Sequence, residues 1–179
     1  MLETLKLIIQ LIPYILELLK AVEVFNPNIS NKICMDIGAS TGGFTEVLLN
    51  EGATKVYAID VGHSQLHPSL LNNPKVINME NTNAKNIPKL KDKIDFFVSD
   101  VSFISITKII LNSSFINLLN SKCYGIILIK PQFESDYKLS SKDNIVPKEL
   151  RTELLNKTLE SLEKIYTILK VIESPITGN

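Results

Sequence analysis

The chain has few of the residues that build metal or disulfide sites. Its 179 residues include two cysteines, two histidines and no tryptophan. Cys34 and Cys123 each lie inside an apolar run, which predicts buried free thiols in a reducing compartment rather than a disulfide or a zinc site. His63 and His67 share one short polar stretch with no third type of ligand beside them, so we predict no metal site there.

An excess of positive charge is also absent. Nineteen Lys and Arg side chains balance nineteen Asp and Glu side chains, and the sequence pI is about 6.7. A domain that binds nucleic acid by charge alone is usually far more basic, so an RNA substrate must be held by a local patch or by another module. Lys85, Lys89, Lys91 and Lys93 form the densest positive run, which we interpret as a solvated loop rather than an RNA track.

The N-terminal segment is apolar, but it is too short and too interrupted to cross a membrane. Residues 5–16 lack a basic leader and a small-residue cleavage site. Polar residues recur at steps of three and four, which predicts a helix over residues 2–24 with one polar stripe. We expect its apolar face to pack against the domain or a partner, including self-association through residues 2–20, and we predict no stable membrane insertion.

Short apolar runs alternate with helical segments from residue 32 onward. Strands are predicted over residues 32–37, 55–60, 75–79, 94–100, 125–130 and 167–172, and helices over residues 44–50, 104–119 and 150–164. Strands that are apolar on both faces and alternate with helices are typical of a parallel sheet covered on both sides. The sequence therefore predicts an α/β fold with a doubly wound, Rossmann-like, mostly parallel sheet and helices on both faces.

A glycine-rich turn follows the first of these strands, within the segment DIGASTGGFT at residues 36–45. Glycines allow a tight turn and the close approach of a ligand, and amides at the start of the next helix can bind a polar or negative group. An acidic residue at the end of the next strand can accept hydrogen bonds from ribose hydroxyls. The predicted cofactor-binding residues are Asp36, Gly38, Ser40, Thr41, Gly42, Gly43, Asp60, Val61 and Asp100.

The glycine spacing discriminates between two classes of cofactor. The dinucleotide pattern G-x-G-x-x-G is not met, because the glycines of this turn are spaced G-x-x-x-G-G. A pyrophosphate therefore has no ready site, and a nucleoside cofactor without phosphates, such as S-adenosylmethionine, fits better. A nicotinamide-dependent oxidoreductase is the weaker alternative.

Two charged residues at strand ends are candidates for catalysis. Asp100 ends the fourth predicted strand and Lys130 ends the fifth, so both side chains are expected on the same edge of the sheet. They form either an acid–base pair or a structural salt bridge. The fourth strand lacks the Asn/Asp-Pro-Pro-aromatic turn common in methyltransferases that act on base amines, which favours a hydroxyl acceptor such as ribose.

Six stretches of the chain resemble the haemolysin A (TlyA-type) family of FtsJ-like ribosomal RNA 2′-O-methyltransferases. They occur in the family's order and read DIGASTGGFT, VYAIDVG, NMENTN, DVSFIS, IKPQFE and ESPITGN. The resemblance implies a cytoplasmic enzyme that uses S-adenosylmethionine and has ribosomal RNA or a ribosomal subunit as its partner. It also implies a Lys-Asp-Lys-Glu catalytic tetrad, in which Asp100 matches the aspartate and Lys130 the second lysine.

The other two members of that tetrad have no direct match in this sequence. Glu17 lies where the family has its first lysine, and Lys20 is the nearest alternative. The family's glutamate follows the Gly-Asn pair that corresponds here to Gly178 and Asn179. We therefore expect methyl transfer to be weak or lost.

The resemblance also predicts that the chain consists of two segments. Residues 1–25 replace the family's S4-type RNA-binding module and linker, and residues 26–179 correspond to a methyltransferase domain that we expect to be C-terminally truncated relative to the family. Two alternatives to an RNA methyltransferase remain open. One is a catalytically inactive paralogue that binds cofactor or RNA, and the other is a membrane-active, haemolysin-like protein.

Overall fold

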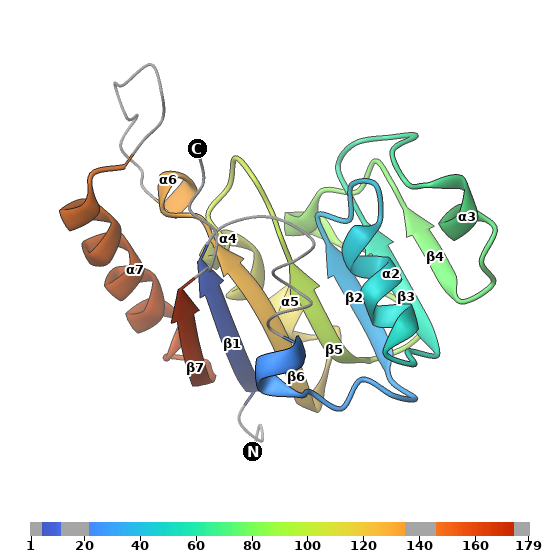
Figure 1. Ribbon diagram of the computed structural model, residues 1–179, viewed down its shortest axis with the longest axis horizontal. Coiled ribbons are helices and arrows are strands. Elements are labelled where there is room, and N and C mark those ends of the chain that lie inside the picture. The colour runs from blue at the N-terminus through green and yellow to red at the C-terminus, as the bar shows by residue number, and fades with distance from the viewer. Residues whose placement is uncertain (1–4, 12–21, 135–145, 174–179) are drawn as a thin grey trace.

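The computed structural model describes residues 5–11, 22–134 and 146–173 of the chain (Figure 1). Seven strands form one sheet in the order β4-β3-β2-β5-β6-β1-β7, and every pair of neighbours is parallel. The predicted doubly wound, parallel α/β fold is therefore confirmed. The strands are β1 (Leu5–Leu11), β2 (Ile33–Ile37), β3 (Lys55–Ile59), β4 (Val76–Met79), β5 (Ile94–Ser99), β6 (Leu119–Ile129) and β7 (Tyr166–Glu173).

Helices cover both faces of the sheet. In Figure 1, α2 (Gly43–Asn50) lies in front of the sheet, whereas α4 (Thr107–Ile110) and α5 (Ser113–Ile116) lie behind it. A further helical turn spans residues 22–25. The short elements α3, η1 and α6 were not predicted from the sequence. The helices are α2 (Gly43–Asn50), α3 (Pro68–Leu71), the 3-10 turn η1 (Ala84–Asn86), α4 (Thr107–Ile110), α5 (Ser113–Ile116), α6 (Pro131–Glu134) and α7 (Lys148–Leu162).

The core consists of two main apolar layers, one on each face of the sheet. Alternate residues of β2 contribute to opposite layers, with Cys34 on the side of α2 and Met35 on the side of α4, α5 and α7. Cys34 and Cys123 are both buried free thiols, as the sequence predicted. Burial, more than the nearby Asp95 carboxylate, raises the pKa of both thiols well above the usual value.

The sheet has its switch point between β2 and β5. From β2 the chain continues outward to β3 and β4, and then returns to the other side of β2 to form β5. In open α/β sheets, ligands bind in the crevice at the carboxyl ends of the strands at such a point. The carboxyl ends of the strands lie along the upper edge in Figure 1.

The N-terminal segment contains a strand, and the helix predicted over residues 2–24 is wrong for residues 5–11. These residues form β1, which pairs with β6 on one side and β7 on the other. A short apolar run fits a central parallel strand as well as a helix, so its conformation is decided by the strands it can pair with. Residues 2–4 and 12–21, with most of the expected self-association segment, lie outside the described residues. Within the described ranges, no helix is long and apolar enough to span a membrane.

The long helix predicted over residues 104–119 is also wrong. The segment forms two short helices, α4 and α5. The side chain of Asn112 accepts a hydrogen bond from the backbone N–H of Ser114 at 3.0 Å, which caps a new helix where the prediction had continued the first. Leu119 already pairs with Ile94 as the first residue of β6.

Candidate active site

The glycine turn after β2 lies directly against the end of β5. Gly38 has a φ of +87°, and a Cβ atom at this position would lie 2.5 Å from the carbonyl oxygen of Asp100. The amides of Gly38 and Ala39 both donate to the carbonyl of Ile59, at 2.8 and 3.1 Å. The turn therefore needs a residue that tolerates positive φ and has no side chain.

Asp60 holds this turn against the loop that follows β3. Its Oδ2 accepts a hydrogen bond from the backbone N–H of Ser40 at 2.8 Å, and its Oδ1 accepts one from Gly62 at 2.7 Å. A carboxylate has lone pairs beyond these two bonds, so the side chain can also accept from ribose hydroxyls. Asp60 thus orders the turn independently of any ligand.

A pocket of about 600 Å³ opens on this edge of the sheet. Five of the nine predicted cofactor-binding residues line it, and they come from the ends of β2, β3 and β5. These five are Gly38, Ser40, Asp60, Val61 and Asp100.

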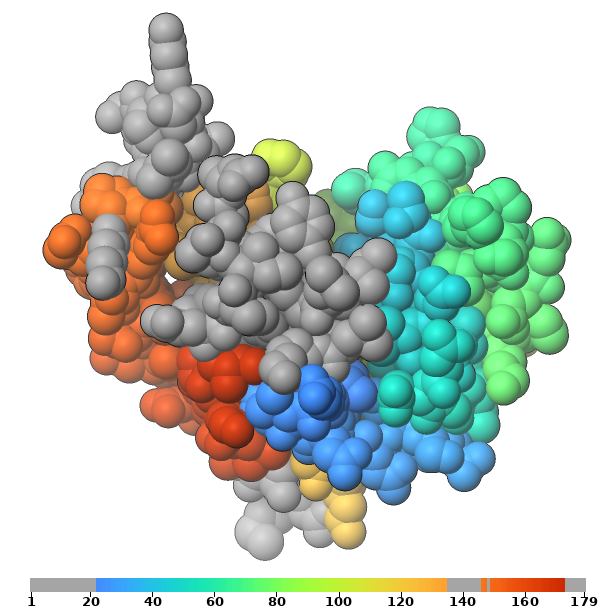
Figure 2. Space-filling view, in the orientation of Figure 1, coloured from blue at the N-terminus to red at the C-terminus, as the bar shows by residue number. Residues whose placement is uncertain are grey.

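Three other predicted residues, Thr41, Gly42 and Gly43, are not in this lining. A Cβ atom at Gly42 would meet side-chain atoms of Leu70 at 2.2 Å and of Leu66 at 2.7 Å, so this glycine serves packing between α2 and the α3 region. Figure 2 shows these two segments side by side on one side of the molecule. Gly43 is the first residue of α2.

Residues after β4 also line the pocket, and sequence reasoning assigned them no role. The amide of Thr82 donates to the carbonyl of Asp60 at 2.9 Å, and the side chain of Asn83 caps η1 by accepting from the amide of Lys85. The only signal in the sequence was the stretch NMENTN. Gln65, Lys85, Ser102 and Phe103 complete the polar and aromatic lining that was missed.

Asp36 lies beneath the turn and is completely buried. Its Oδ2 accepts a hydrogen bond from the hydroxyl of Thr45 at 2.7 Å, whereas its Oδ1 has no hydrogen-bond partner among the described residues. Burial, with a smaller contribution from the carboxylates of Asp100 and Asp60, raises the pKa of Asp36 to about 7. Asp36 is therefore a buried acid behind the turn.

We expect Asp36→Asn to remove a pH dependence of stability. Between pH 3.8 and about 7 the folded protein keeps the Asp36 proton, whereas the unfolded chain loses it. The folded state then binds more protons, so the free energy of unfolding of the wild type falls as pH rises through this interval. Urea unfolding at about pH 5 and about pH 8 should show the wild type losing stability relative to the variant. A difference that stays constant with pH would contradict the raised pKa.

Asp100 and Lys130 meet at the ends of β5 and β6. The Nζ of Lys130 lies 2.6 Å from Oδ1 of Asp100 and donates a hydrogen bond to the hydroxyl of Ser102 at 3.0 Å. Lys130 is only 7% exposed. The contact with Asp100 is an ion pair, whereas the contact with Ser102 is a hydrogen bond. The two residues singled out from the sequence thus form one ion pair beside the pocket.

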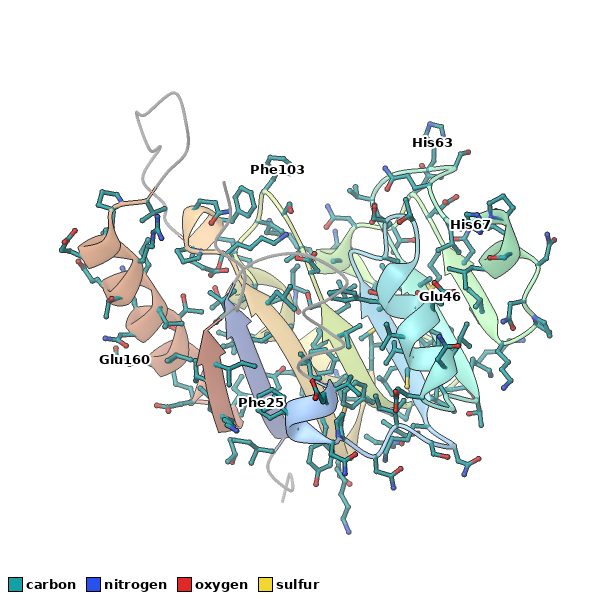
Figure 3. The ribbon with its side chains drawn as sticks, in the orientation of Figure 1. Phe25, Glu46, His63, His67, Phe103 and Glu160 are labelled. Atoms are coloured by element: carbon teal, nitrogen blue, oxygen red, sulfur yellow. The ribbon has the colours of Figure 1, made fainter. Side chains whose placement is uncertain are left out.

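Backbone strain is concentrated on the same edge of the sheet. Four of the six described non-glycine residues with positive φ lie here, namely Ser40, Ser64, Asn81 and Phe103, whereas Asn26 and Asn31 precede β2. Such conformations cost about 1–3 kcal/mol each and cluster at ligand sites. Phe103 is also 90% exposed, and its ring centroid lies 5.1 Å from that of Phe133. Figure 3 shows the Phe103 ring projecting from the upper edge of the sheet.

The two histidines, His63 and His67, lie away from Phe103 (Figure 3). The Nδ1 of His63 is 3.2 Å from the hydroxyl of Ser64, and that of His67 is 2.7 Å from the hydroxyl of Ser69. Within the described part of the chain, no three His, Cys, Asp or Glu side chains are grouped so that they could hold a metal ion.

Comparison with known proteins gives a consistent set of relatives. The FtsJ-like methyltransferase family matches residues 15–179. The chain is 48% identical over 147 residues to Hemolysin A of Brachyspira hyodysenteriae, a match that covers 80% of this chain and 60% of that protein. It is 41% identical over 120 residues to the 16S/23S rRNA (cytidine-2′-O)-methyltransferase TlyA of Mycobacterium tuberculosis, which covers 66% of this chain and 44% of that protein.

A solved structure shows the same fold. It is that of a candidate hemolysin from Lactococcus lactis, which is 34% identical to this chain with a TM-score of 0.77. The match covers 84% of this chain and 73% of that structure. The matched regions of the two curated relatives make up 60% and 44% of their lengths, so the chain corresponds to one part of each.

Proposed function

Because the chain belongs to the FtsJ-like methyltransferase family, we propose that it transfers a methyl group from S-adenosylmethionine to a ribose 2′-hydroxyl of ribosomal RNA. The observation that carries this proposal is the Asp100–Lys130 ion pair beside the pocket at the glycine turn. The RNA substrate, in free form or in a ribosomal subunit, is the one named for the Mycobacterium tuberculosis relative. The proposed place of action is the cytoplasm.

The residues of the pocket fit S-adenosylmethionine better than a dinucleotide. Asp60 and Asp100 place two carboxylates in the lining. With Lys85 as the single basic residue of the lining, the pocket has a net negative charge, which disfavours the two negative charges of a pyrophosphate and favours a positively charged sulfonium. Gly38 lines the pocket and has no side chain, so the cofactor can approach the backbone of the turn closely there. In this arrangement Asp60 would hold the ribose hydroxyls, and the turn would hold the amino-acid part of the cofactor.

The chain's own residues supply what a ribose hydroxyl needs to react. When bound, S-adenosylmethionine supplies an electrophilic methyl group. A ribose hydroxyl is a weak nucleophile at neutral pH and needs a nearby base or a cation that stabilises the developing charge on its oxygen. Lys130, held by Asp100 and Ser102, orients the hydroxyl oxygen and stabilises that charge. The hydroxyl proton passes to the carboxylate of Asp100, since the Lys130 ammonium has no lone pair to accept it.

An exposed aromatic ring beside this pair supports RNA as the substrate. Phe103 is 90% exposed and is supported from one side by Phe133. Stacking of a base on an aromatic side chain contributes about 1–3 kcal/mol per base and requires no positive charge. A stacking surface therefore accords with the balanced net charge of the chain.

Two alternatives concern residues near the N-terminus. An inactive module that binds cofactor or RNA is favoured by Glu17 in the place of a lysine, a position outside the described residues. A membrane-active protein was suggested by the predicted apolar helix and has a counterpart in the name of the Brachyspira relative. Residues 5–11 are a paired strand of the sheet, which removes that rationale for this segment.

Calorimetry and a methyl-transfer assay test the proposed function. We expect saturable binding of S-adenosylmethionine and incorporation of labelled methyl groups into ribosomal subunits, with the label recovered as 2′-O-methylnucleoside after digestion. No binding at millimolar cofactor would contradict the proposal. Binding without transfer would favour the inactive binding module.

A further inference from the structure

Two loops carry the reacting pair, and they contact each other at successive points. One loop runs from the end of β5 to α4, and the other runs from the end of β6 through α6. Lys130 contacts Asp100 and Ser102 across the gap. Phe133 contacts Phe103 further along both loops. The pairing of β5 with β6 brings the two strand ends together, and these contacts continue along the loops beyond them.

Glu134, the last residue of α6, makes the contact furthest from the reacting pair. Its Oε2 accepts a hydrogen bond from the hydroxyl of Ser105 at 2.6 Å, and its Oε1 accepts one from the backbone N–H of Ile106 at 3.1 Å. The hydroxyl of Thr158, on α7, also hydrogen-bonds to this carboxyl. One carboxyl group thus joins three segments that are distant in the sequence.

Stability alone does not explain an acid at this position. Burial raises the pKa of Glu134, and this influence is larger than that of any of its hydrogen bonds. Buried charged groups can often be replaced by well-packed apolar residues without loss of stability. A paired carboxylate does provide a fixed geometry, because its two oxygens accept from two neighbouring residues of the β5–α4 loop at once.

We propose that Glu134 is a positioning residue for the Asp100–Lys130 pair. By holding Ser105 and Ile106 it fixes the separation of the two loops, and with it the position of the Lys130 ammonium against Asp100. A misplacement of about 1 Å in a reacting group can lower a rate by about a hundredfold. Only this kinetic consequence rests on the proposed methyl transfer, since the positioning itself concerns the folded chain.

Glu134→Gln tests the positioning without an activity assay. The amide keeps the shape of the side chain but loses the charge and one acceptor oxygen. We expect acetylation of Lys130 by an amine-reactive reagent, followed by mass spectrometry, to become several-fold faster. Lys55, in an ion pair with Asp92, should be labelled as in the wild type. Unchanged labelling of Lys130 in the folded variant would overturn the proposal.

Two further variants keep this test decisive. Glu160→Gln makes the same change at an exposed position of α7 and should leave Lys130 labelling unchanged. Ser105→Ala removes one of the two hydrogen bonds from the β5–α4 loop and should give a smaller increase. If Glu134→Gln does not fold, Ser105→Ala decides the question, and wild-type labelling of Lys130 in that variant would overturn the proposal.

Kinetics provide a second readout. We expect Glu134→Gln to lower kcat for methyl transfer about tenfold or more while the Kd for S-adenosylmethionine stays unchanged, because Glu134 does not line the pocket. Joint loss of cofactor binding and folding stability would indicate a merely structural role and overturn the proposal. If the wild type transfers no methyl group, the proposed function fails, whereas the labelling experiment still decides the positioning.

Discussion

Lys130→Met is expected to slow methyl transfer by orders of magnitude while S-adenosylmethionine still binds. Methionine fills a similar volume without the ammonium, so nothing remains to orient the ribose hydroxyl or to stabilise charge on its oxygen. Lys130 does not line the pocket, so the cofactor contacts are preserved. General acid–base contributions of this kind are worth about 10²–10⁴ in rate, and we expect a loss in that range.

Single-turnover methyl transfer, measured beside calorimetry of the same preparation, separates these two effects. Lys55→Met is the matched control, because it breaks an ion pair with Asp92 away from the pocket. It should leave the transfer rate unchanged. A Lys130→Met rate close to that of the wild type would show that the Asp100–Lys130 pair is a structural salt bridge, the alternative left open by the sequence.

Gly38→Ala is expected to destabilise the whole domain and to abolish cofactor binding. The added Cβ would lie 2.5 Å from the carbonyl oxygen and 3.0 Å from the carbonyl carbon of Asp100, both backbone atoms that cannot rotate away. The positive φ adds about 1–2 kcal/mol of strain. Together we expect a loss of about 3 kcal/mol or more in the free energy of unfolding, a large share of the stability of a typical domain.

Gly52→Ala distinguishes the backbone strain of a positive φ from the steric clash of an added Cβ atom. Gly52 has nearly the same φ, +89°, but a Cβ atom there would come no closer than 3.4 Å to the atoms of Ser30. Urea unfolding of this variant should therefore show only the strain, about 1–2 kcal/mol. If Gly38→Ala costs no more than Gly52→Ala, the close approach of β2 to the end of β5 is not what requires glycine at position 38.

The sequence predicted the parts of the site that depend on local pattern. An apolar strand followed by glycines places the turn, and the rule that parallel strands end on one edge places Asp60, Asp100 and Lys130 together. The lining by Thr82 and Asn83 could not be predicted in this way, because it depends on how the loop after β4 folds back against Asp60.

Features that depend on long-range contacts could not be predicted from the local sequence pattern. Residues 5–11 suit a helix or a strand equally well, and only β6 and β7 on either side make them a strand. The same holds for Glu134. It lies in the recognised stretch IKPQFE, but its partners Ser105 and Ile106 belong to another loop, and only the folded chain brings them together.

The place of β1 in the sheet has a consequence for synthesis. During translation β1 is made long before the strands that flank it, since Tyr124 and Tyr166 must emerge before both sides can pair. Until then the apolar residues of β1 lack at least one of the two strands with which they pair. Pairing between distant segments slows folding and leaves such runs open to aggregation. The half of the sheet formed by β6, β1 and β7 therefore joins strands that are far apart in the sequence, and it can be completed only after β7 has been translated.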